Sequence, residues 1–476
     1  MSRRRPRPAL VAALAVLALV GAACSSRGED STAPEASDTT AAADDAGAAE
    51  VTFGDLPSPC GPAAETDADA TTTTEGSSSG AGTPEGDTQG ITDDAILVGT
   101  VADPGFSGTP GLNQEIFDAG DAFTAWCNEQ GGINGRRIEL TKYDAAISNY
   151  QSKMLEACGQ EFAIVGDGAV QDNLWASTGA ECGLIDVAGF AVTPEKSGTV
   201  GPDVVAESRV VQPVPNTADT YEVGGLQTLA EENPEAFQNV GILYGDFDTL
   251  RVQADKGRQA IEAEGGTVVS ELTYNLTGEA NWAPIAQALE ADGVQWLYFV
   301  GQPGNLAALQ QSMVEIDWRP EVTFVEANHY DPAYLEAAGD AAEGTYVRAV
   351  YVPFEEADQN PATQDYLDMV AEVDGKTALL GAQSVSAWLL FAEAARQCDR
   401  AGDLTRTCVL DTAGSVTEWT GGGLHGVTDP STNTPTACSM ILQVQDGAFV
   451  RYAPEEGFDC GEDNLIEIEV EDTAGD

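Results

Sequence analysis

Basic residues and histidines are scarce in this chain of 476 residues. Lysine and arginine number 21 together against 78 aspartates and glutamates, so the formal net charge is −57, and there are 2 histidines. Because an acidic surface repels phosphates, this charge argues against binding to nucleic acid and against docking on anionic lipid headgroups. Two histidines leave little scope for a catalytic triad or a metal cluster. We interpret the excess of carboxylates mainly as a source of solubility outside the cell.

The chain also lacks short motifs that carry common enzyme and metal chemistry. The sequences H-E-x-x-H, G-x-x-x-x-G-K-[ST] and C-x-x-C are all absent. We therefore expect a protein that binds without catalysis and uses no metal and no cofactor. Hydrophobic residues make up 42% of the chain, which excludes full disorder, and the length is typical of two or three globular units.

The apolar run over residues 9–20 is too short to span a bilayer. Arginines at positions 3, 4, 5 and 7 precede it and Gly21-Ala22-Ala23-Cys24 follows, which predicts a signal peptide over residues 1–23. The last four residues resemble a bacterial lipobox, with Gly21 where that motif usually has an aliphatic residue. The resemblance implies cleavage before Cys24, lipidation of its sulfur, and attachment to the extracytoplasmic face of the cell membrane through this anchor alone. The alternative is an ordinary secreted protein with a leftover cysteine.

Residues 24–89 are rich in Thr, Ser, Ala and Asp and include low-complexity runs at 71–74 and 77–80. Such a composition cannot bury enough apolar surface to offset the entropy of ordering the chain. We expect a disordered stalk between the anchor and the folded body. Residues 50–60 are a candidate for an ordered piece, because they carry apolar side chains and Cys60.

Cysteine usage also indicates export. Of nine cysteines, eight remain when Cys24 is set aside, an even number that indicates four disulfides. Eight cysteines allow on the order of a hundred pairings, so the sequence leaves the connectivity open. Local order along the chain suggests Cys158 with Cys182, Cys398 with Cys408, and Cys438 with Cys460, which leaves Cys60 with Cys127.

Short apolar runs alternate with helical patterns over the rest of the chain. Strands are predicted at 96–101, 137–143, 162–166, 183–188, 240–244, 267–272 and 295–300, and helices at 116–128, 150–160, 174–182, 253–264 and 283–291. This alternation predicts parallel, doubly wound α/β sheets, and its restart near residue 240 predicts two lobes. Because ligands of open α/β sheets bind at the carboxyl ends of strands, we expect a site in a cleft between the lobes.

The run N-x-x-G-G-I-N-G-R at residues 128–136 lies between a predicted helix and a predicted strand. With residues 90–99, 193–195, 264–269 and 341–346, it is very similar to the periplasmic binding proteins of the leucine/isoleucine/valine type. The resemblance covers about residues 90–471 and implies the type I fold, in which two Rossmann-like lobes are joined by a hinge of three crossovers. It places lobe I at 90–212 and 353–437, and lobe II at 213–352 and 438–472.

The resemblance also implies which strand-end loops line the cleft. The candidate ligand-binding residues are Phe106, Ser107, Gly168, Ala169, Val170, Gln171, Ala191, Thr193, Phe247, Thr249, Gln302, Asn328, His329 and Tyr330. The chain departs from the amino-acid binders where residues 168–171 replace a Ser-rich loop, and where Asn328 stands near the acid that meets an α-ammonium group. The alternatives are therefore a neutral or amide-like compound, a small peptide, or an aromatic or carboxylate metabolite. His425 is expected in a loop near the hinge.

The resemblance implies a solute-binding lipoprotein of an ABC importer. Its expected partners are a small polar organic solute and the permease subunits in the membrane, and we expect a monomer. The alternative is a lipoprotein receptor of the same fold that senses a ligand and signals to a partner without transport, because fold alone does not separate the two functions.

Overall fold

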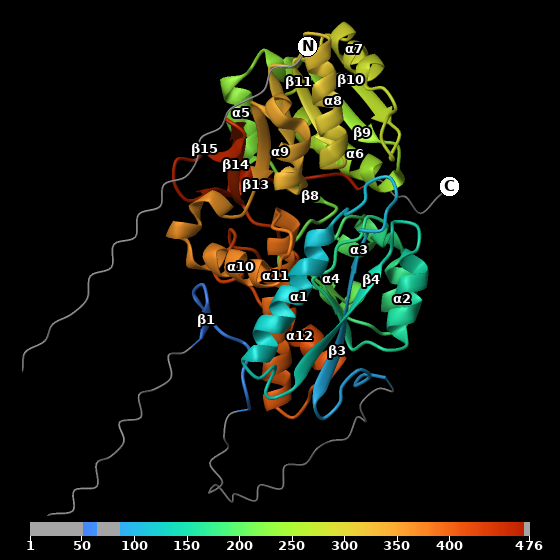
Figure 1. The fold of residues 1–476 in the computed structure, drawn as a ribbon, viewed down its shortest axis with the longest axis vertical. Helices are drawn as coiled ribbons and strands as arrows, with labels where there is room; N and C mark the ends of the chain where they lie inside the picture. Colours follow the sequence, from blue (N-terminus) through green and yellow to red (C-terminus); the bar gives the residue numbers. More distant parts are fainter. Residues whose placement is uncertain (1–50, 64–85, 471–476) are drawn as a thin grey trace, which may run out of the picture. The chain divides into compact units, whose positions relative to one another are not determined.

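The computed structural model describes residues 51–63 and 86–470 of the chain (Figure 1). The predicted signal peptide, Cys24 and most of the predicted stalk lie outside the described residues. Residues 51–63 and 86–89, which the stalk prediction includes, lie within them.

Five parallel strands form the first sheet, in the order β4-β3-β5-β6-β7. The interior strand β3, between β4 and β5, is apolar and buried along nearly its whole length, as expected for a strand with helices on both faces. The strands are β3 (Ala95–Ala102), β4 (Arg137–Asp144), β5 (Ala163–Val165), β6 (Asp186–Val187) and β7 (Val210–Val211).

Helices cover both faces of this sheet. On one face, Phe123 of α1 and Trp388 of α11 pack against Val98, and on the other Met154 of α2 packs in a cluster with Tyr143. Figure 1 shows α10, α11 and α12, from late in the chain, beside strands from its N-terminal part. This sheet and the helices around it form the first lobe. Its helices are α1 (Gln114–Glu129), α2 (Tyr150–Cys158), α3 (Pro194–Ser197), α4 (Val204–Ser208), α10 (Pro361–Glu372), α11 (Leu379–Arg400) and α12 (Arg406–Ala413).

The second sheet has the strand order β10-β9-β11-β12-β13-β14-β15, and β16 also pairs with β14. The first five are parallel, whereas β14, β15 and β16 are antiparallel to their neighbours. The strands are β9 (Val240–Gly245), β10 (Val268–Tyr274), β11 (Trp296–Val300), β12 (Val322–Val325), β13 (Thr345–Ala349), β14 (Cys438–Gln445), β15 (Ala448–Ala453) and β16 (Asp459–Cys460).

Helices again cover both faces. Leu226 of α5 and Ile261 of α6 pack on one face with Trp296, while Leu289 of α7 and Leu306 of α8 belong to the core on the other face. The helices are α5 (Gly224–Glu232), α6 (Asp248–Ala263), α7 (Ala283–Ala291), α8 (Pro303–Glu315) and α9 (Pro332–Ala338). Two short pairs complete the fold: β8 (Thr220–Glu222) with β17 (Leu465–Glu467), and β1 (Thr52–Phe53) with β2 (Leu56–Pro57).

The chain crosses between the sheets three times: after β7, after β13 and before β14. Hydrogen bonds tie the crossing segments together. The Thr428 hydroxyl donates to the carbonyl of Pro213 at 2.6 Å, and the backbone N–H of Gly426 donates to the carbonyl of Val350 at 3.0 Å. His425 lies buried in this region, 2.9 Å from the Ser386 hydroxyl. These bonds couple the crossing segments at the place where a hinge would bend.

Four disulfides join Cys60 to Cys127, Cys158 to Cys182, Cys398 to Cys408 and Cys438 to Cys460. The first attaches the segment that follows the β1–β2 hairpin to α1. Phe53 of that hairpin is fully buried and meets Trp126 edge to face. Residues 51–60 are therefore an ordered part of the first lobe.

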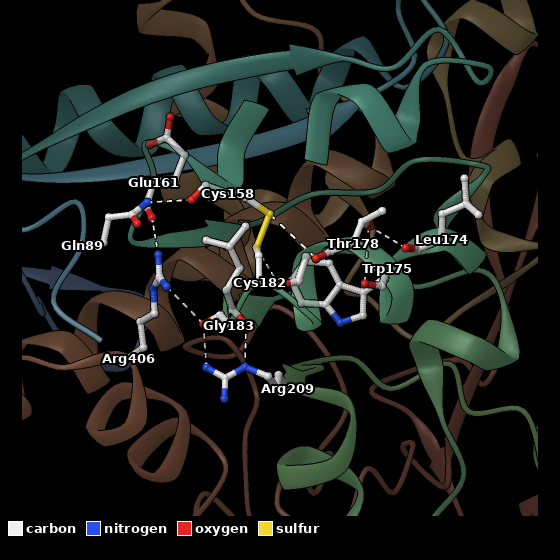
Figure 2. The surroundings of a disulfide bond; sticks show 12 residues. Gln89, Cys158, Glu161, Leu174, Trp175, Thr178, Cys182, Gly183, Arg209 and Arg406 are labelled. Atoms are coloured by element: carbon white, nitrogen blue, oxygen red, sulfur yellow. Dashed lines mark hydrogen bonds between the residues drawn. A yellow bond between two sulfur atoms is a disulfide. The ribbon is translucent and has the colours of Figure 1, made fainter. Parts of the chain in front are cut away.

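The second disulfide lies in a network that closes the far end of this lobe (Figure 2). Gln89 donates to the carbonyl of Cys158, and Arg406 donates to the carbonyls of Glu161 and Gly183. Arg209 donates a further bond to Gly183 at 2.8 Å. Guanidinium groups here hold carbonyl groups that the short strands leave unpaired.

The helix expected at 174–182 is replaced by a 3₁₀ turn, η1 (Asp172–Leu174), and a π turn, η2 (Ala176–Ala180). The indole N–H of Trp175 is fixed 2.8 Å from the carbonyl of Ser208, and Cys182 is tied to α2. Gly179 lies against the Trp175 ring, where a side chain would clash. These tertiary contacts override the helical pattern of the sequence.

Candidate functional site

A cavity of about 260 Å³ lies between the two lobes. Its walls are largely apolar, with Phe190, Val192 and Leu380 from the first lobe facing Leu250 and Leu276 from the second. The lining also includes residues 109–113, Glu115, Val170, Gln253, residues 300–304, Glu326, Asn328, Asp331, Ala333, Tyr334 and Lys376.

A smaller cavity of about 110 Å³ is lined in part by the same residues. The shared residues are Phe190, Gln253, Glu326, Asn328 and Leu380. The smaller cavity adds Arg348, Glu222 and Gln383, and it reaches residues 214–216 and 349–351 of two crossing segments. A ligand placed between the lobes would therefore touch both lobes and the crossing segments.

The lobes contact each other around the larger cavity. The Thr109 hydroxyl donates to the Gln302 side chain, and the Gln253 amide donates to the carbonyl of Val192 at 2.6 Å. An ion pair between Lys376 and Asp331, 2.7 Å, also crosses from the first lobe to the second. The structure thus has the lobes in contact around a space that a small solute can fill.

One charged cluster in the wall centres on Lys376. Its Nζ lies 2.8 Å from Glu115 and 2.7 Å from Asp331, and the other Asp331 oxygen accepts from the backbone N–H of Ala333 at the start of α9. Burial raises the pKa of Glu115 although Lys376 opposes the shift.

A second cluster centres on Arg348 of β13. Its guanidinium donates two hydrogen bonds to Glu326, at 2.9 and 2.7 Å, and lies 3.4 Å from Glu222. Hydroxyls of Tyr221 and Tyr298 donate to the second Glu326 oxygen. Burial alone would raise the pKa of Glu326, but Arg348 and the two hydroxyls hold it below its ordinary value. Burial raises the pKa of Glu222 to about 7 against the pull of Arg348.

Buried carboxylates hold the first-lobe loops that end near the cavity. Asp103 accepts from the backbone N–H groups of Ile147 and Val170, at 2.5 and 2.7 Å. Asp172 accepts from those of Val192 and Thr193, at 2.7 and 3.0 Å. Burial raises the pKa of Asp172 to about 7. These bonds fix the backbone of loops whose side chains line the cavity.

Beneath these loops, the fully buried Lys196 lies 2.7 Å from Asp167 and 2.7 Å from Asp186. The ion-pair network joins the ends of β5 and β6 to α3. It has no side chain in the cavity lining, so its role at the site is to support the loops.

Of the predicted ligand-binding residues, Val170, Gln302 and Asn328 line the larger cavity, and Asn328 also lines the smaller one. The others lie outside both linings: Phe106, Ser107, Gly168, Ala169, Gln171, Ala191, Thr193, Phe247, Thr249, His329 and Tyr330. Several of them directly adjoin lining residues, such as Ala191 between Phe190 and Val192.

His329 and Tyr330 take part in packing. His329 is fully buried, with Phe299 and Tyr334 meeting its ring edge to face, and burial lowers its pKa to about 4. Tyr330 stacks on Phe354 with ring centroids 4.7 Å apart, and its hydroxyl donates to Glu355.

Sequence reasoning missed lining residues that come from helices. Gln253 lies on α6, Gln383 on α11, and Lys376 just before α11. Lys376 and Gln383 lie far along the chain from a strand end, and Gln253 lies within α6 beyond the loop that follows β9, so the rule about carboxyl ends of strands did not find them. The chain shows no local motif at these positions.

The chain belongs to the periplasmic binding protein family, whose model matches residues 106–448. A leucine-binding protein from Thermotoga maritima is 15% identical, has a TM-score of 0.62, and aligns over 78% of this chain and 100% of its own. A fatty acid ABC transporter substrate-binding protein from Thermomonospora curvata is 17% identical, has a TM-score of 0.63, and aligns over 80% and 97%.

A substrate-binding periplasmic protein from Ralstonia solanacearum is 19% identical, has a TM-score of 0.60, and aligns over 75% of this chain and 100% of its own. A search of curated proteins found no match. The solved structures share the fold, which confirms the predicted type I architecture of mixed α/β lobes with parallel sheets.

Two further features concern only residues 51–63 and 86–470. No helix among them has the length and apolar character needed to cross a membrane. Within the same residues, no cluster of three or more His, Cys, Asp or Glu side chains is arranged to hold a metal ion.

Proposed function

We propose that this chain is an extracytoplasmic, lipid-anchored solute-binding protein of an ABC importer. It captures a small polar organic solute (amino-acid-like, amide-like, peptide-like or a small carboxylate) by hinge closure, without chemical turnover. The observation that carries the proposal is the cavity of about 260 Å³ with walls from both lobes and polar contacts between them around it.

The mechanism follows from the position of the cavity. A ligand that touches both lobes binds the closed form better than the open form, so it shifts the population toward the closed form. We assign residues 90–212 and 353–437 to lobe I and residues 213–352 and 438–472 to lobe II. The closed form, held on the membrane by lipidated Cys24, then docks on the permease as a monomer.

The similar solved structures support a small-molecule ligand of this general kind. One is named for leucine and another for fatty acid. Both ligands combine an apolar body with a polar group, and the cavity in this chain has mostly apolar walls with amide and charged side chains among them.

Thermal unfolding of the purified, oxidised protein against a panel of amino acids, amides, peptides, small carboxylates and fatty acids tests the proposal. A ligand at 100 times its dissociation constant adds about 2.7 kcal/mol to the free energy of unfolding, which raises the melting midpoint visibly. Recovery of the bound compound unchanged, by mass spectrometry, would support binding without turnover. Conversion of the compound, or no shift with the panel and no small molecule retained on purification, would count against the proposal.

A further inference from the structure

The charged side chains that line the two cavities already have partners within the protein. Arg348 has both guanidinium edges on Glu326 and Glu222, and Lys376 lies between Glu115 and Asp331. The two cations and the four carboxylates therefore use most of their hydrogen-bonding capacity on one another and on further donors of the protein.

Three of these four carboxylates have both oxygens engaged. Glu326 accepts from Arg348 on one oxygen and from two tyrosine hydroxyls on the other. Glu222 accepts from Arg348 on one oxygen and from the backbone N–H of Gly224, at 2.6 Å, on the other. Asp331 accepts from Lys376 on one oxygen and from the backbone N–H of Ala333 on the other. Glu115 is buried and has its charged partner in Lys376, 2.8 Å away. A charged ligand group would have to compete with these bonds.

Four of the amide side chains in the same walls differ from the charged groups, because part of their hydrogen-bonding capacity has no partner among the described residues. Gln383 is 6% exposed and makes no side-chain hydrogen bond to another described residue. Gln302 is also 6% exposed and uses its oxygen toward Thr109, which leaves its NH₂ group. Gln253 and Asn328 donate to backbone carbonyls at 2.6 and 2.9 Å, which leaves their oxygens.

Burying an amide without a hydrogen bond costs free energy, and burying an ion without a partner costs far more. A neutral ligand with donors and acceptors would satisfy the four amides and leave the ion pairs intact. Its apolar part would lie against Phe190, Leu250 and Leu380. A zwitterion would bring two charges to walls where the charged side chains are already paired.

We infer that the ligand of the interlobe cavity is an uncharged organic solute with an apolar body and amide or hydroxyl groups, bound through Gln253, Gln302, Asn328 and Gln383. The inference rests on the proposed function and narrows its solute class. It also assigns a ligand-binding role to two helix residues, Gln253 of α6 and Gln383 of α11.

Four compounds that share the leucine side chain and differ in charge test the inference. N-acetylleucinamide is neutral, leucine is a zwitterion, N-acetylleucine is an anion and leucinamide is a cation at neutral pH. Melting curves of the full mature protein with each probe at millimolar concentration should show an upward shift with N-acetylleucinamide alone. A larger shift with any charged form would overturn the inference and leave the solute-binding proposal standing. Absence of a shift with all four compounds would also overturn the inference. The proposed function is tested separately, by the panel of amino acids, amides, peptides, small carboxylates and fatty acids.

Matched variants locate the interaction. Gln383→Met keeps the volume and removes the amide, and it should weaken N-acetylleucinamide binding about three- to tenfold by calorimetry. Gln397→Met, on an exposed face of the same helix, is the control and should bind like the parent. Equal binding by all three proteins would remove Gln383 from the site.

A charge-introducing variant provides the second test. Gln302→Glu places an unpaired carboxylate in the cavity, and it should weaken N-acetylleucinamide binding and admit leucinamide. Gln160→Glu adds the same charge at an exposed position of the first lobe and should change neither. If Gln302→Glu binds N-acetylleucinamide and leucinamide with the same preference as the parent, the placement of this side chain at the ligand is contradicted.

Discussion

At the scale of single residues, Asn328 and Gln302, two of the three proposed ligand-binding amides of the second lobe, give the most direct test of the site. Asn328→Ala and Gln302→Ala each remove a polar group from the cavity wall while leaving the hydrophobic cores unchanged. We expect each variant to bind solute about three- to tenfold more weakly, with the melting midpoint of the ligand-free protein nearly unchanged.

The control for this pair is Asn173→Ala, an exposed position outside both cavity linings. Calorimetry with a solute found in the melting screen measures the three affinities. Equal binding by the parent and both cavity variants would contradict the position of these residues in the site.

Asp172 gives a pH-dependent prediction. Burial raises its pKa in the folded protein from an ordinary value of 3.8 to about 7, with Lys196 opposing and Asp167 adding to the shift. Because the folded state holds this proton more tightly than the unfolded state, the contribution of Asp172 to stability is present at low pH and is lost as pH rises from about 4 to 7. Each unit of pKa difference corresponds to about 1.4 kcal/mol.

Asp172→Asn removes this titration and keeps an oxygen acceptor near Val192 and Thr193. The free energy of unfolding of the variant, relative to the parent, should therefore rise between pH 4 and pH 7 in denaturant titrations. Asp203→Asn, at an exposed position, serves as the reference. A constant difference between the Asp172 variant and the parent across this range would show that Asp172 does not titrate as described.

At the scale of elements, the contact between β5 and α11 sets how closely a helix approaches the first sheet. Gly166, just after β5, has φ of +64°. A Cβ there would lie 2.5 Å from the Ser384 hydroxyl and 2.5 Å from the indole nitrogen of Trp388. The absent side chain lets α11 lie against the strand end, and the buried Ser384 hydroxyl donates to the Gly166 carbonyl at 2.7 Å.

Gly166→Ala should lower the free energy of unfolding by roughly 2–4 kcal/mol, from overpacking and left-handed backbone strain. Gly201→Ala, where a methyl group meets open space, should have little effect. Chemical denaturation of both variants measures the difference. A Gly166→Ala protein as stable as the parent would mean that α11 can shift away without cost.

At the scale of the whole molecule, Lys376 joins the lobes through Asp331 while it neutralises Glu115 on its own lobe. Lys376→Gln leaves the carboxylates of Glu115 and Asp331, which both contact the Lys376 Nζ in the parent, without the cation between them. Like charges this close together repel. We expect the ligand-free variant to have a larger radius of gyration than the parent in X-ray scattering, and to bind solute more weakly.

Added salt should reduce both effects of Lys376→Gln, because it screens the repulsion. Lys153→Gln, which breaks only a surface pair with Glu156, is the control. Scattering curves that superimpose for the parent and Lys376→Gln would show that this ion pair does not hold the lobes together.

The architecture was accessible from the sequence because its signals are local. The alternation of apolar runs and helical patterns predicted two parallel sheets, and the segment at 128–136 matched the family that the comparison confirms. Where a tertiary contact competed with local preference, as at Trp175 and Cys182, the predicted helix gave way to two short turns.

The lining of the cavity could be predicted from the sequence only in part. Strand-end loops predicted Val170, Gln302 and Asn328, since the carboxyl ends of parallel strands meet at one edge of each sheet. Gln253, Lys376 and Gln383 required the tertiary structure, because the docking of one lobe on the other decides which faces of α6 and α11 meet the cleft. The sequence by itself therefore determined the class of fold, through patterns within tens of residues, whereas contacts between distant segments decided the chemistry of the binding site.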